Sequence, residues 1–400
     1  GSQDVVVSRL SANGSTLQMS TYIGGSAFET GTGIALDANN NIYVSGRTSS
    51  TNFPTTAGAY KVVKGASIDA FVTKLDTAGG IVYSTFIGGD GNDEAHDIAV
   101  DGLNRAYITG QTEGGTYPIL GAFDPTYNGG AWDAFVTRLT ANGAALSYSS
   151  YLGGSGYDYG YGIAVSANEA YVTGYTTSSN FTCVAGAYDT TYNGAGDAFV
   201  TRVAANGASL VASTFVGGTD TDSGEDIALG GQGHVFITGW AASPNYPTTL
   251  GASDTSHNGG TDVIVTKLNG ALASLTYSTF AGGSSNDYGY GIAINSAGGA
   301  AATGLTSSTD FPVVIPTQAA FGGGVNDAFV LRVVPTGASL NFSTYLGGGG
   351  YEYARAVALD SAGLPIVTGV ASDALFPTVP GSYDVTHNGV WDVFVTKLQP

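Results

Sequence analysis

The sequence predicts an all-β protein, a β-propeller of four-stranded blades, and three observations predict it. A seven-residue phrase of the type Asp-Ala-Phe-Val-Thr-Lys-Leu recurs seven times, at intervals of 64 or 65 residues. Three further short phrases, rich in β-branched and aromatic residues, recur between its copies in a fixed order, and no stretch has sustained helical periodicity. So regular a period indicates one supersecondary unit in tandem copies, each burying apolar surface against its neighbours.

The four phrases of each repeat have the composition of short strands, and turns of Gly, Asn and Asp bound them. The first is an apolar run, as at 98–101, and the second is of the type found at 106–110. The third is the seven-residue phrase, and the fourth is aromatic and ends in Gly-Gly, as at 83–89. We expect the first strand to be innermost in its blade, because it is the shortest and carries a small alanine. Radial closure of such blades leaves few exposed strand edges.

The pattern Gly-Ile-Ala-Val-Asp-x-x-Gly-Asn-x-Tyr-Val-Thr-Gly, which covers the first two strands, is similar to the inner strands of NHL-type blades. As a whole, the repeat resembles the bacterial β-propeller repeat family known as SBBP, over essentially the entire chain. The family name implies seven blades, and the resemblance implies a large extracellular bacterial protein. This chain departs from the name because it holds six copies of the first strand.

Six first strands predict six blades, with seven as the alternative, in a single β-propeller domain over residues 1–400 made of about six 65-residue repeats. The chain opens with a third-strand phrase, Asp4 to Leu10, and a fourth-strand phrase, Gln18 to Ile23. It stops after another third-strand phrase, so we expect Gln18 to Ile23 to pair with Val393 to Leu398 and to close the ring. The strand Asp4 to Leu10 is then surplus. It either joins the rim or belongs to a seventh blade of a longer array.

Composition narrows the possible partners and compartments. The net charge of −19 disfavours nucleic acid and anionic membranes as partners, and no apolar run is long enough for membrane insertion. The single cysteine, Cys183, excludes a disulfide framework within the chain. The chain has no initiator Met and no signal peptide, which indicates a processed or excised fragment. Together with the resemblance, this predicts a secreted or cell-surface protein.

Acidic residues and tyrosines recur just before each first strand and are the candidate binding residues. Side chains that point inward would form an acidic, tyrosine-rich ring suited to a cation or to sugar hydroxyls. Side chains that point to the backbone would instead cap loop N–H groups. The acids are Glu29, Asp93, Asp158, Asp222, Asp287 and Glu352, and the tyrosines are Tyr159, Tyr161, Tyr288, Tyr290 and Tyr353.

Loops of about twenty residues join the second and third strands of each repeat, far longer than a hairpin needs. Alternating strand direction places these long loops and the six acids on the same face. Each loop contains an Asn-Phe-Pro-like phrase and then one like Gly-Ala-Tyr-Asp-x-x-Tyr-Asn-Gly. Such a loop is either a small core of its own or a ligand-binding rim.

Two acid clusters are weak candidates for calcium, since calcium takes oxygen ligands, but neither has the spacing of an EF-hand. The clusters contain Asp90, Asp93 and Asp97, and Asp220, Asp222 and Asp226. No other cofactor is predicted, and no catalytic triad, phosphate loop or zinc pattern is present.

These observations predict a non-catalytic binding or scaffold propeller that engages a glycan or a protein through its long-loop face. One alternative is a structural subunit of an extracellular assembly, an oligomer formed through the surplus N-terminal strand. Another is an enzyme that acts on an extracellular polysaccharide, with acids and tyrosines as acid–base groups. The near equivalence of the repeats argues against the enzyme, because a catalytic centre normally depends on residues unique to one blade.

Overall fold

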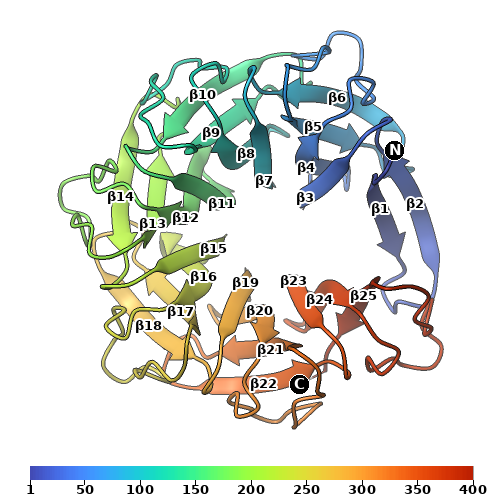
Figure 1. Cartoon of the computed structure of the whole chain (residues 1–400), viewed down its shortest axis with the longest axis vertical. Coiled ribbons are helices and arrows are strands. Elements are labelled where there is room, and N and C mark those ends of the chain that lie inside the picture. The colour runs from blue at the N-terminus through green and yellow to red at the C-terminus, as the bar shows by residue number, and fades with distance from the viewer. Residues whose placement is uncertain (400) are drawn as a thin grey trace. The chain divides into compact units, whose positions relative to one another are not determined.

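The computed structural model describes residues 1–399 and confirms an all-β protein, a six-bladed β-propeller (Figure 1). Each blade is an antiparallel sheet whose strands follow one another in chain order. Five blades have four strands and the last has three. Within the described residues the helical structure is a single 3-10 turn at Gly231–Gly233. The strand order within each blade is the one predicted from the four repeated phrases.

The strands of the six blades have the following bounds. Blade 1 contains β3 (Glu29–Leu36), β4 (Ile42–Thr48), β5 (Asp69–Leu75) and β6 (Ile81–Ile87). Blade 2 contains β7 (Asp93–Val100), β8 (Ala106–Thr112), β9 (Asp133–Leu139) and β10 (Leu146–Leu152). Blade 3 contains β11 (Asp158–Ser166), β12 (Glu169–Thr176), β13 (Asp197–Val203) and β14 (Leu210–Val216). Blade 4 contains β15 (Asp222–Leu229), β16 (Val235–Ala241), β17 (Asp262–Leu268) and β18 (Leu275–Ala281). Blade 5 contains β19 (Asp287–Ile294), β20 (Ala300–Thr306), β21 (Asp327–Val333) and β22 (Leu340–Leu346). Blade 6 contains β23 (Glu352–Leu359), β24 (Pro365–Ala371) and β25 (Asp392–Lys397).

The chain divides into two compact units, residues 1–185 with 200–213 and residues 186–199 with 214–400. The division passes through β13 and β14 of blade 3. The single domain expected from the sequence stays a prediction. In residues 1–399 no helix has the length and apolar character needed to cross a membrane.

Apolar contacts between successive blades form the core of each unit. In the first unit, Tyr43 and Val72 of blade 1 pack with Ile98 and Ile108 of blade 2. In the second unit, Val265 of blade 4 belongs to a cluster with residues of blade 5. Burying one such side chain contributes about 1.5–3 kcal/mol, so neighbouring blades stabilise each other.

The turn between the first and second strands of blade 1 is fixed by its own side chains. Asp37 follows β3, and its Oδ1 accepts hydrogen bonds from the N–H groups of Asn39 and Asn41, both at 2.9 Å. Asn40 has a φ of 60°, which asparagine tolerates. The Asp37 carboxylate also lies 3.1 Å from Lys74 Nζ on β5. The turn is therefore tied to the third strand of its own blade.

Every first strand contains a β-bulge at one residue, so that this residue has no partner in the second strand. In blade 3, for example, Gly160 lies opposite Gly174 and Gly162 lies opposite Thr173, which leaves Tyr161 unmatched. A bulge redirects the side chain it carries. The six bulge residues are Thr32, His96, Tyr161, Glu225, Tyr290 and Arg355.

The structure places the N-terminal strands differently from the expectation. β2 (Leu17–Ile23) pairs with β1 (Val5–Leu10), from Ile23 opposite Val5 to Leu17 opposite Leu10. These two strands form a two-stranded sheet, and the last sheet contains β23, β24 and β25 only. The expected pairing of Gln18 to Ile23 with the final strand is therefore replaced by a local hairpin. The turn between β1 and β2 is short, so the surplus phrase Asp4 to Leu10 is the nearest strand available to β2.

Candidate functional site

The six acids expected near a ligand are buried, with at most 1% of each residue exposed. Asp158 accepts hydrogen bonds from the N–H of Gly154 and the hydroxyl of Ser178, both at 2.8 Å, and from the hydroxyl of Thr176. The other acids each accept from the N–H four residues earlier, in the pairs Gly25 with Glu29, Gly89 with Asp93, Gly218 with Asp222, Gly283 with Asp287, and Gly348 with Glu352. Capping of the loop backbone is thus the arrangement found.

The same contacts place each acid beside the long loop of its blade. Ser178 begins the long loop of blade 3, and Asn180 two residues later accepts from the N–H of Ser155 at 2.8 Å. In blade 4, Asn245 accepts from the N–H of Thr219 at 2.9 Å. Within a blade, the acid and the long loop therefore lie at the same end, as alternating strand direction predicts.

The long loops of blades 1 to 5 each have a buried aromatic anchor, and the corresponding Phe376 of blade 6 is partly buried. Phe53 of the Asn-Phe-Pro phrase is 3% exposed and lies 4.6 Å, ring centre to ring centre, from Phe71 on β5. Phe311 occupies the corresponding place on Phe329 of β21, at 4.8 Å. The first half of the loop is thus a small core packed on its own blade, which is one of the two alternatives predicted for it.

Buried aspartates at the start of the third strands lie close to these acids. A Cβ on Gly282 would lie 3.0 Å from Asp287 Oδ2 and would overlap Asp262 Oδ1, so the two carboxyl groups share one small space. Burial, followed by the nearby Asp287 carboxylate, raises the pKa of Asp262 to about 6. Burial and the nearby Asp158 carboxylate raise the pKa of Asp133 to about 7. These acid pairs are internal to the joints between blades and are not surface ligands.

Replacing Asp158 with alanine tests the capping role. The change leaves the N–H of Gly154 and the hydroxyl of Ser178 buried without their acceptor, so we expect a loss of about 2 kcal/mol in the free energy of unfolding. Urea unfolding followed by circular dichroism measures this loss. Unchanged stability together with a loss of glycan binding would show instead that Asp158 serves the ligand.

In each of the two acid clusters proposed for calcium, the side chains lie in different environments. Asp90 and Asp220 are exposed, whereas Asp93 and Asp222 are buried in their loops. Asp97 Oδ2 accepts from the N–H of Ile163 on the next blade at 2.8 Å. Asp226 Oδ2 accepts from the N–H of Ile292 at 2.8 Å. Across the part of the chain that the structure describes, no group of three or more His, Cys, Asp or Glu side chains could hold a metal ion, and calcium binding stays a prediction.

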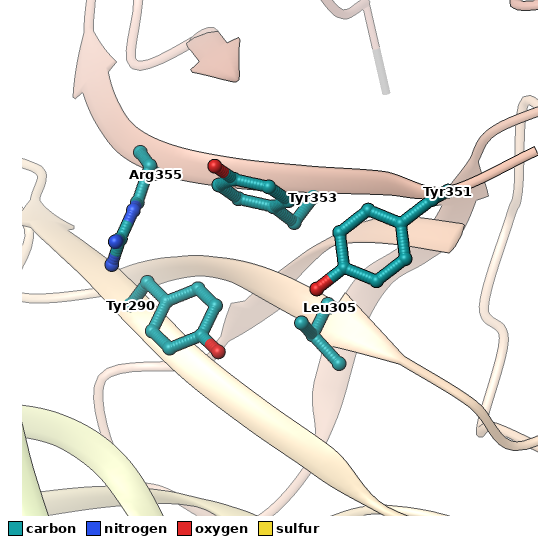
Figure 2. A pocket seen from close by; sticks show the side chains of 5 residues that line it. All are labelled: Tyr290, Leu305, Tyr351, Tyr353 and Arg355. Atoms are coloured by element: carbon teal, nitrogen blue, oxygen red, sulfur yellow. The ribbon is translucent and has the colours of Figure 1, made fainter. Parts of the chain in front are cut away.

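The candidate site lies where two bulge residues of the second unit, Tyr290 and Arg355, face each other (Figure 2). Together with Leu305, Tyr351 and Tyr353 they line a pocket of about 160 Å³. Pockets that enclose a whole drug-sized ligand hold about 300 Å³ or more. This pocket therefore fits one ring or one end group of a larger ligand.

The arginine and the tyrosine rings of the pocket hold one another in place. The Arg355 guanidinium lies over the ring of Tyr290, 5.0 Å from its centre, and 5.5 Å from the centre of the Tyr353 ring. Figure 2 shows this guanidinium beside the two rings, with Tyr351 across the pocket. Cation–π contacts of this kind contribute roughly 0.5–2 kcal/mol and leave the N–H groups of arginine free to donate elsewhere.

A further bulge residue, Glu225, extends the site along the first strands of blades 4, 5 and 6. Its Oε1 accepts hydrogen bonds from the Ser223 hydroxyl at 2.8 Å and from Trp240 Nε1 at 3.0 Å. Burial raises the pKa of Glu225, and the charge of Arg355 opposes this rise. Burial also raises the pKa of Tyr290, and the negative charge of Glu225 adds to the rise. Tyr290 therefore keeps its hydroxyl proton and can both donate and accept hydrogen bonds.

The rim of the pocket reaches the long loop of blade 6. The ring of Tyr351 contacts the ring of Trp391 edge to face, 5.3 Å between centres, and Trp391 immediately precedes β25. On the other side, Tyr288 stacks on Tyr290 at 6.4 Å and contacts Trp240 edge to face at 5.6 Å. The aromatic surface of the second unit is thus continuous from β16 to the long loop of blade 6.

The remaining tyrosines proposed from the sequence lie in the first unit. Tyr159 and Tyr161 are parallel, with ring centres 5.9 Å apart, and His96 stacks on Tyr161 at 5.3 Å. Nδ1 of His96 lies 3.1 Å from the carbonyl oxygen of Gly160. These rings form an aromatic row of their own.

Sequence reasoning placed Tyr290 and Tyr353 in the site but missed Tyr351, Leu305, Arg355 and Glu225. A usable signal was present for the last two. The residues on either side of each bulge repeat as Gly, Ala or Asp, whereas the bulge position itself changes in chemical class from Thr to His, Tyr, Glu, Tyr and Arg. A position whose residue type varies within an otherwise uniform repeat indicates a side chain with a role specific to its blade.

The fold defines the class of protein as a β-propeller. Its first strands differ from blade to blade at the bulge residue. The SBBP family model, described as a β-propeller repeat, matches residues 18–54, 82–118 and 147–182, so the chain contains SBBP repeats, as the sequence predicted. The matches begin in β2, β6 and β10, and each runs through the first two strands of the next blade. No match is found among curated proteins.

The solved structures that are similar to this chain have low sequence identity to it. One is hydrazine synthase of Kuenenia stuttgartiensis, with 12% identity, a TM-score of 0.46, and coverage of 88% of this chain and 80% of that one. Another is the Pan2 WD40 domain of Neurospora crassa, with 8% identity, a TM-score of 0.40, and coverage of 85% and 86%. A third is a gluconolactonase of Xanthomonas campestris, with 11% identity, a TM-score of 0.37, and coverage of 87% and 84%. Likeness at this level says nothing about the function of this chain.

Proposed function

We propose that the chain is a non-catalytic binding module of a secreted or cell-surface protein, and that it binds a glycan in the pocket between blades 5 and 6. The observation that carries this proposal is the lining of the pocket by three tyrosines and one arginine. One end of the pocket adjoins the long loop of blade 6 through Tyr351 and Trp391. A ligand therefore enters from the long-loop end of these blades.

The chemistry of the pocket matches a sugar ring better than a purely apolar ligand. Aromatic rings offer flat apolar faces for the C–H groups of a pyranose, and the tyrosine hydroxyls offer polar edges for its hydroxyl groups. The Arg355 guanidinium adds N–H donors in a fixed plane. The rings are already packed against one another, so little side-chain freedom is lost when the ligand binds.

Isothermal titration against a panel of oligosaccharides of bacterial and plant walls tests the proposal. We expect Tyr290→Ala and Tyr353→Ala each to weaken binding at least about tenfold, because loss of a packed aromatic contact typically costs more than 1 kcal/mol. Tyr383→Ala is the matched control, since Tyr383 is 54% exposed and does not line the pocket. Binding that survives both pocket substitutions, or that is lost equally in the control, would contradict the proposal.

The same panel addresses the alternative functions. If an oligosaccharide is consumed during incubation, and Glu225→Gln abolishes its consumption, the protein is an enzyme and the non-catalytic proposal fails. If no oligosaccharide binds and sedimentation shows a defined oligomer that depends on β1, the structural-subunit alternative replaces it.

A further inference from the structure

A lysine in the long loop of blade 1 lies against the buried aspartate that begins the third strand of the same blade. Nζ of Lys61 is 2.8 Å from Oδ2 of Asp69, the first residue of β5. The same Nζ donates a hydrogen bond to the carbonyl oxygen of Gly88 at 2.7 Å. The Asp69 side chain is fully buried, and 24% of the Lys61 side chain is exposed. An amine and a carboxyl group are therefore held in contact at a site largely closed to water.

The repeat does not require a lysine at this position. The main-chain N–H of Lys61 donates to the hydroxyl of Thr85 on β6 at 2.9 Å, and the long loops of blades 2 to 5 each make the same bond to their fourth strand. The residues that make it there are Asp124, Asp189, Asp254 and Gln318. Among these five blades, the first therefore differs from the others in bringing an amine to the aspartate of its third strand.

A second buried acid, Asp93, lies beside this pair. It begins β7 of blade 2, and its N–H donates to the carbonyl oxygen of Ile68, the residue before Asp69, at 2.8 Å. Burial raises the pKa of Asp93 to about 7, the charge of Asp69 adds to the rise, and the charge of Lys61 opposes it. Oδ1 of Asp69 is itself buried and has no hydrogen-bond partner within the described residues. A protonated carboxyl group is thus available next to the lysine and the aspartate.

We propose that Lys61 and Asp69 condense to an intramolecular isopeptide bond, an amide between Nζ of the lysine and Cγ of the aspartate, and that Asp93 promotes the reaction. The Nζ–Cγ bond forms and the bond from Cγ to Oδ2 breaks. Oδ2 leaves as water with two of the three ammonium protons, and the third proton stays on the amide nitrogen. No oxidation state changes, so the reaction needs no oxidant, reductant or cofactor.

The surroundings of the pair favour each step. Buried charges are disfavoured, which favours transfer of an ammonium proton to Oδ2 of Asp69 across their 2.8 Å hydrogen bond. The neutral amine then attacks Cγ, and Asp93 donates its proton to the negative charge that develops on Oδ1. Asp93 recovers a proton from the attacking nitrogen, passes one to the departing oxygen, and ends the reaction protonated. Well-oriented groups within one molecule react as if present at effective concentrations of about 10⁵ M or more.

The bond closes a covalent ring over residues 61–69 and fixes the second half of the long loop to β5. The loop is already held to β6 at this point, because the N–H of Phe86 donates to the carbonyl oxygen of Lys61 at 3.0 Å. A covalent link between two segments restricts the unfolded chain as well as the folded one. The long loop of blade 1 should therefore open locally less often than the loops of the other blades.

Intact mass spectrometry of the full chain under denaturing conditions tests the proposal. We expect a mass lower by one water molecule than the sequence gives, and a branched tryptic peptide that joins the segments containing Lys61 and Asp69. Lys61→Arg and Asp69→Ala should each restore the full mass. Asp93→Asn should leave most of the freshly purified protein without the bond, because an amide cannot act as the acid.

Lys64→Arg is the matched control, because Nζ of Lys64, in the same loop, donates to the main-chain carbonyl oxygens of Gly65 and Ser67. We expect this variant to lose one water molecule as the unchanged chain does. The full mass for the unchanged folded chain after prolonged incubation at about pH 7 overturns the proposal. A water loss that persists in Lys61→Arg, or that maps to a cyclic imide at Asp90–Gly91 or Asp101–Gly102, also overturns it. Complete bond formation in Asp93→Asn overturns the role of Asp93.

Discussion

Replacing Gly304 with alanine is expected to cost about 3 kcal/mol or more of unfolding free energy. Gly304 lies in β20, opposite Gly289 of β19. A Cβ at this position would overlap the carbonyl oxygen of Tyr288. Because the obstructing atom belongs to the backbone, no side chain can move aside, and β19 and β20 must separate locally. Strain at this pair also displaces Tyr290 and Leu305, which line the pocket.

Gly102→Ala is the matched control for this prediction. Gly102 lies in the turn after β7, and a Cβ there meets nothing within 4 Å. Urea unfolding of both variants gives the comparison, and we expect the control to stay within about 0.5 kcal/mol of the unchanged chain. Equal midpoints for the two variants would show that the sheet of blade 5 accommodates a side chain where the structure leaves no room.

Raising the pH from about 5 to about 8 is expected to destabilise the protein by an amount on the order of 5 kcal/mol. Seven buried aspartates carry pKa values raised by burial to about 6 or 7, namely Asp93, Asp97, Asp133, Asp197, Asp222, Asp262 and Asp327. A carboxyl group with a raised folded pKa binds its proton more tightly in the folded state. Its stabilising effect is complete below the ordinary value of 3.8 and is lost as the pH rises through about 7.

Carboxyl groups whose pKa is lowered in the folded protein limit its stability at acidic pH. Burial acts to raise the pKa of Asp37, but its hydrogen bonds with Asn41, Asn39 and Lys74 outweigh burial and hold that pKa at about 2. The stability that Asp37 contributes is present above the ordinary value and is lost as the pH falls toward about 2. Stability should therefore be greatest near about pH 4 to 5, measured by urea unfolding at a series of pH values.

Asp133→Asn isolates one of the raised groups. Asp133 Oδ1 is buried without a hydrogen-bond partner, and the amide keeps the shape of the side chain and an oxygen to accept from the N–H of Asn128. We expect this variant to be more stable than the unchanged chain at about pH 8, by roughly 1 kcal/mol, and to depend less on pH. Asp384→Asn is the control, because hydrogen bonds with Thr386 lower the pKa of Asp384. Stability that rises between pH 5 and pH 8 would contradict the assignment.

The repeat made much of the architecture predictable from the sequence. Strand bounds such as Asp69–Leu75 and Asp133–Leu139 coincide with the repeated phrases because alternating β-branched residues and Gly or Asn turns act over a few neighbouring residues. The order of strands in a blade followed from the order of the phrases, since successive antiparallel strands pair with their nearest neighbours. Tyr290 and Tyr353 were candidates because tyrosines recur beside the acids that precede the first strands, which is also a local signal.

Three features were decided only by the tertiary structure. The direction of the six acids depended on which buried N–H and hydroxyl groups needed an acceptor, and for Asp158 these were Gly154, Thr176 and Ser178. The partner of β2 depended on the competition between a local hairpin and a distant strand. The pocket depended on Arg355 of one blade reaching Tyr290 of the blade before it. A repeat determines what each blade contains because its signals are local, whereas contacts between blades arise from residues about 65 positions apart, which only the packed chain brings together.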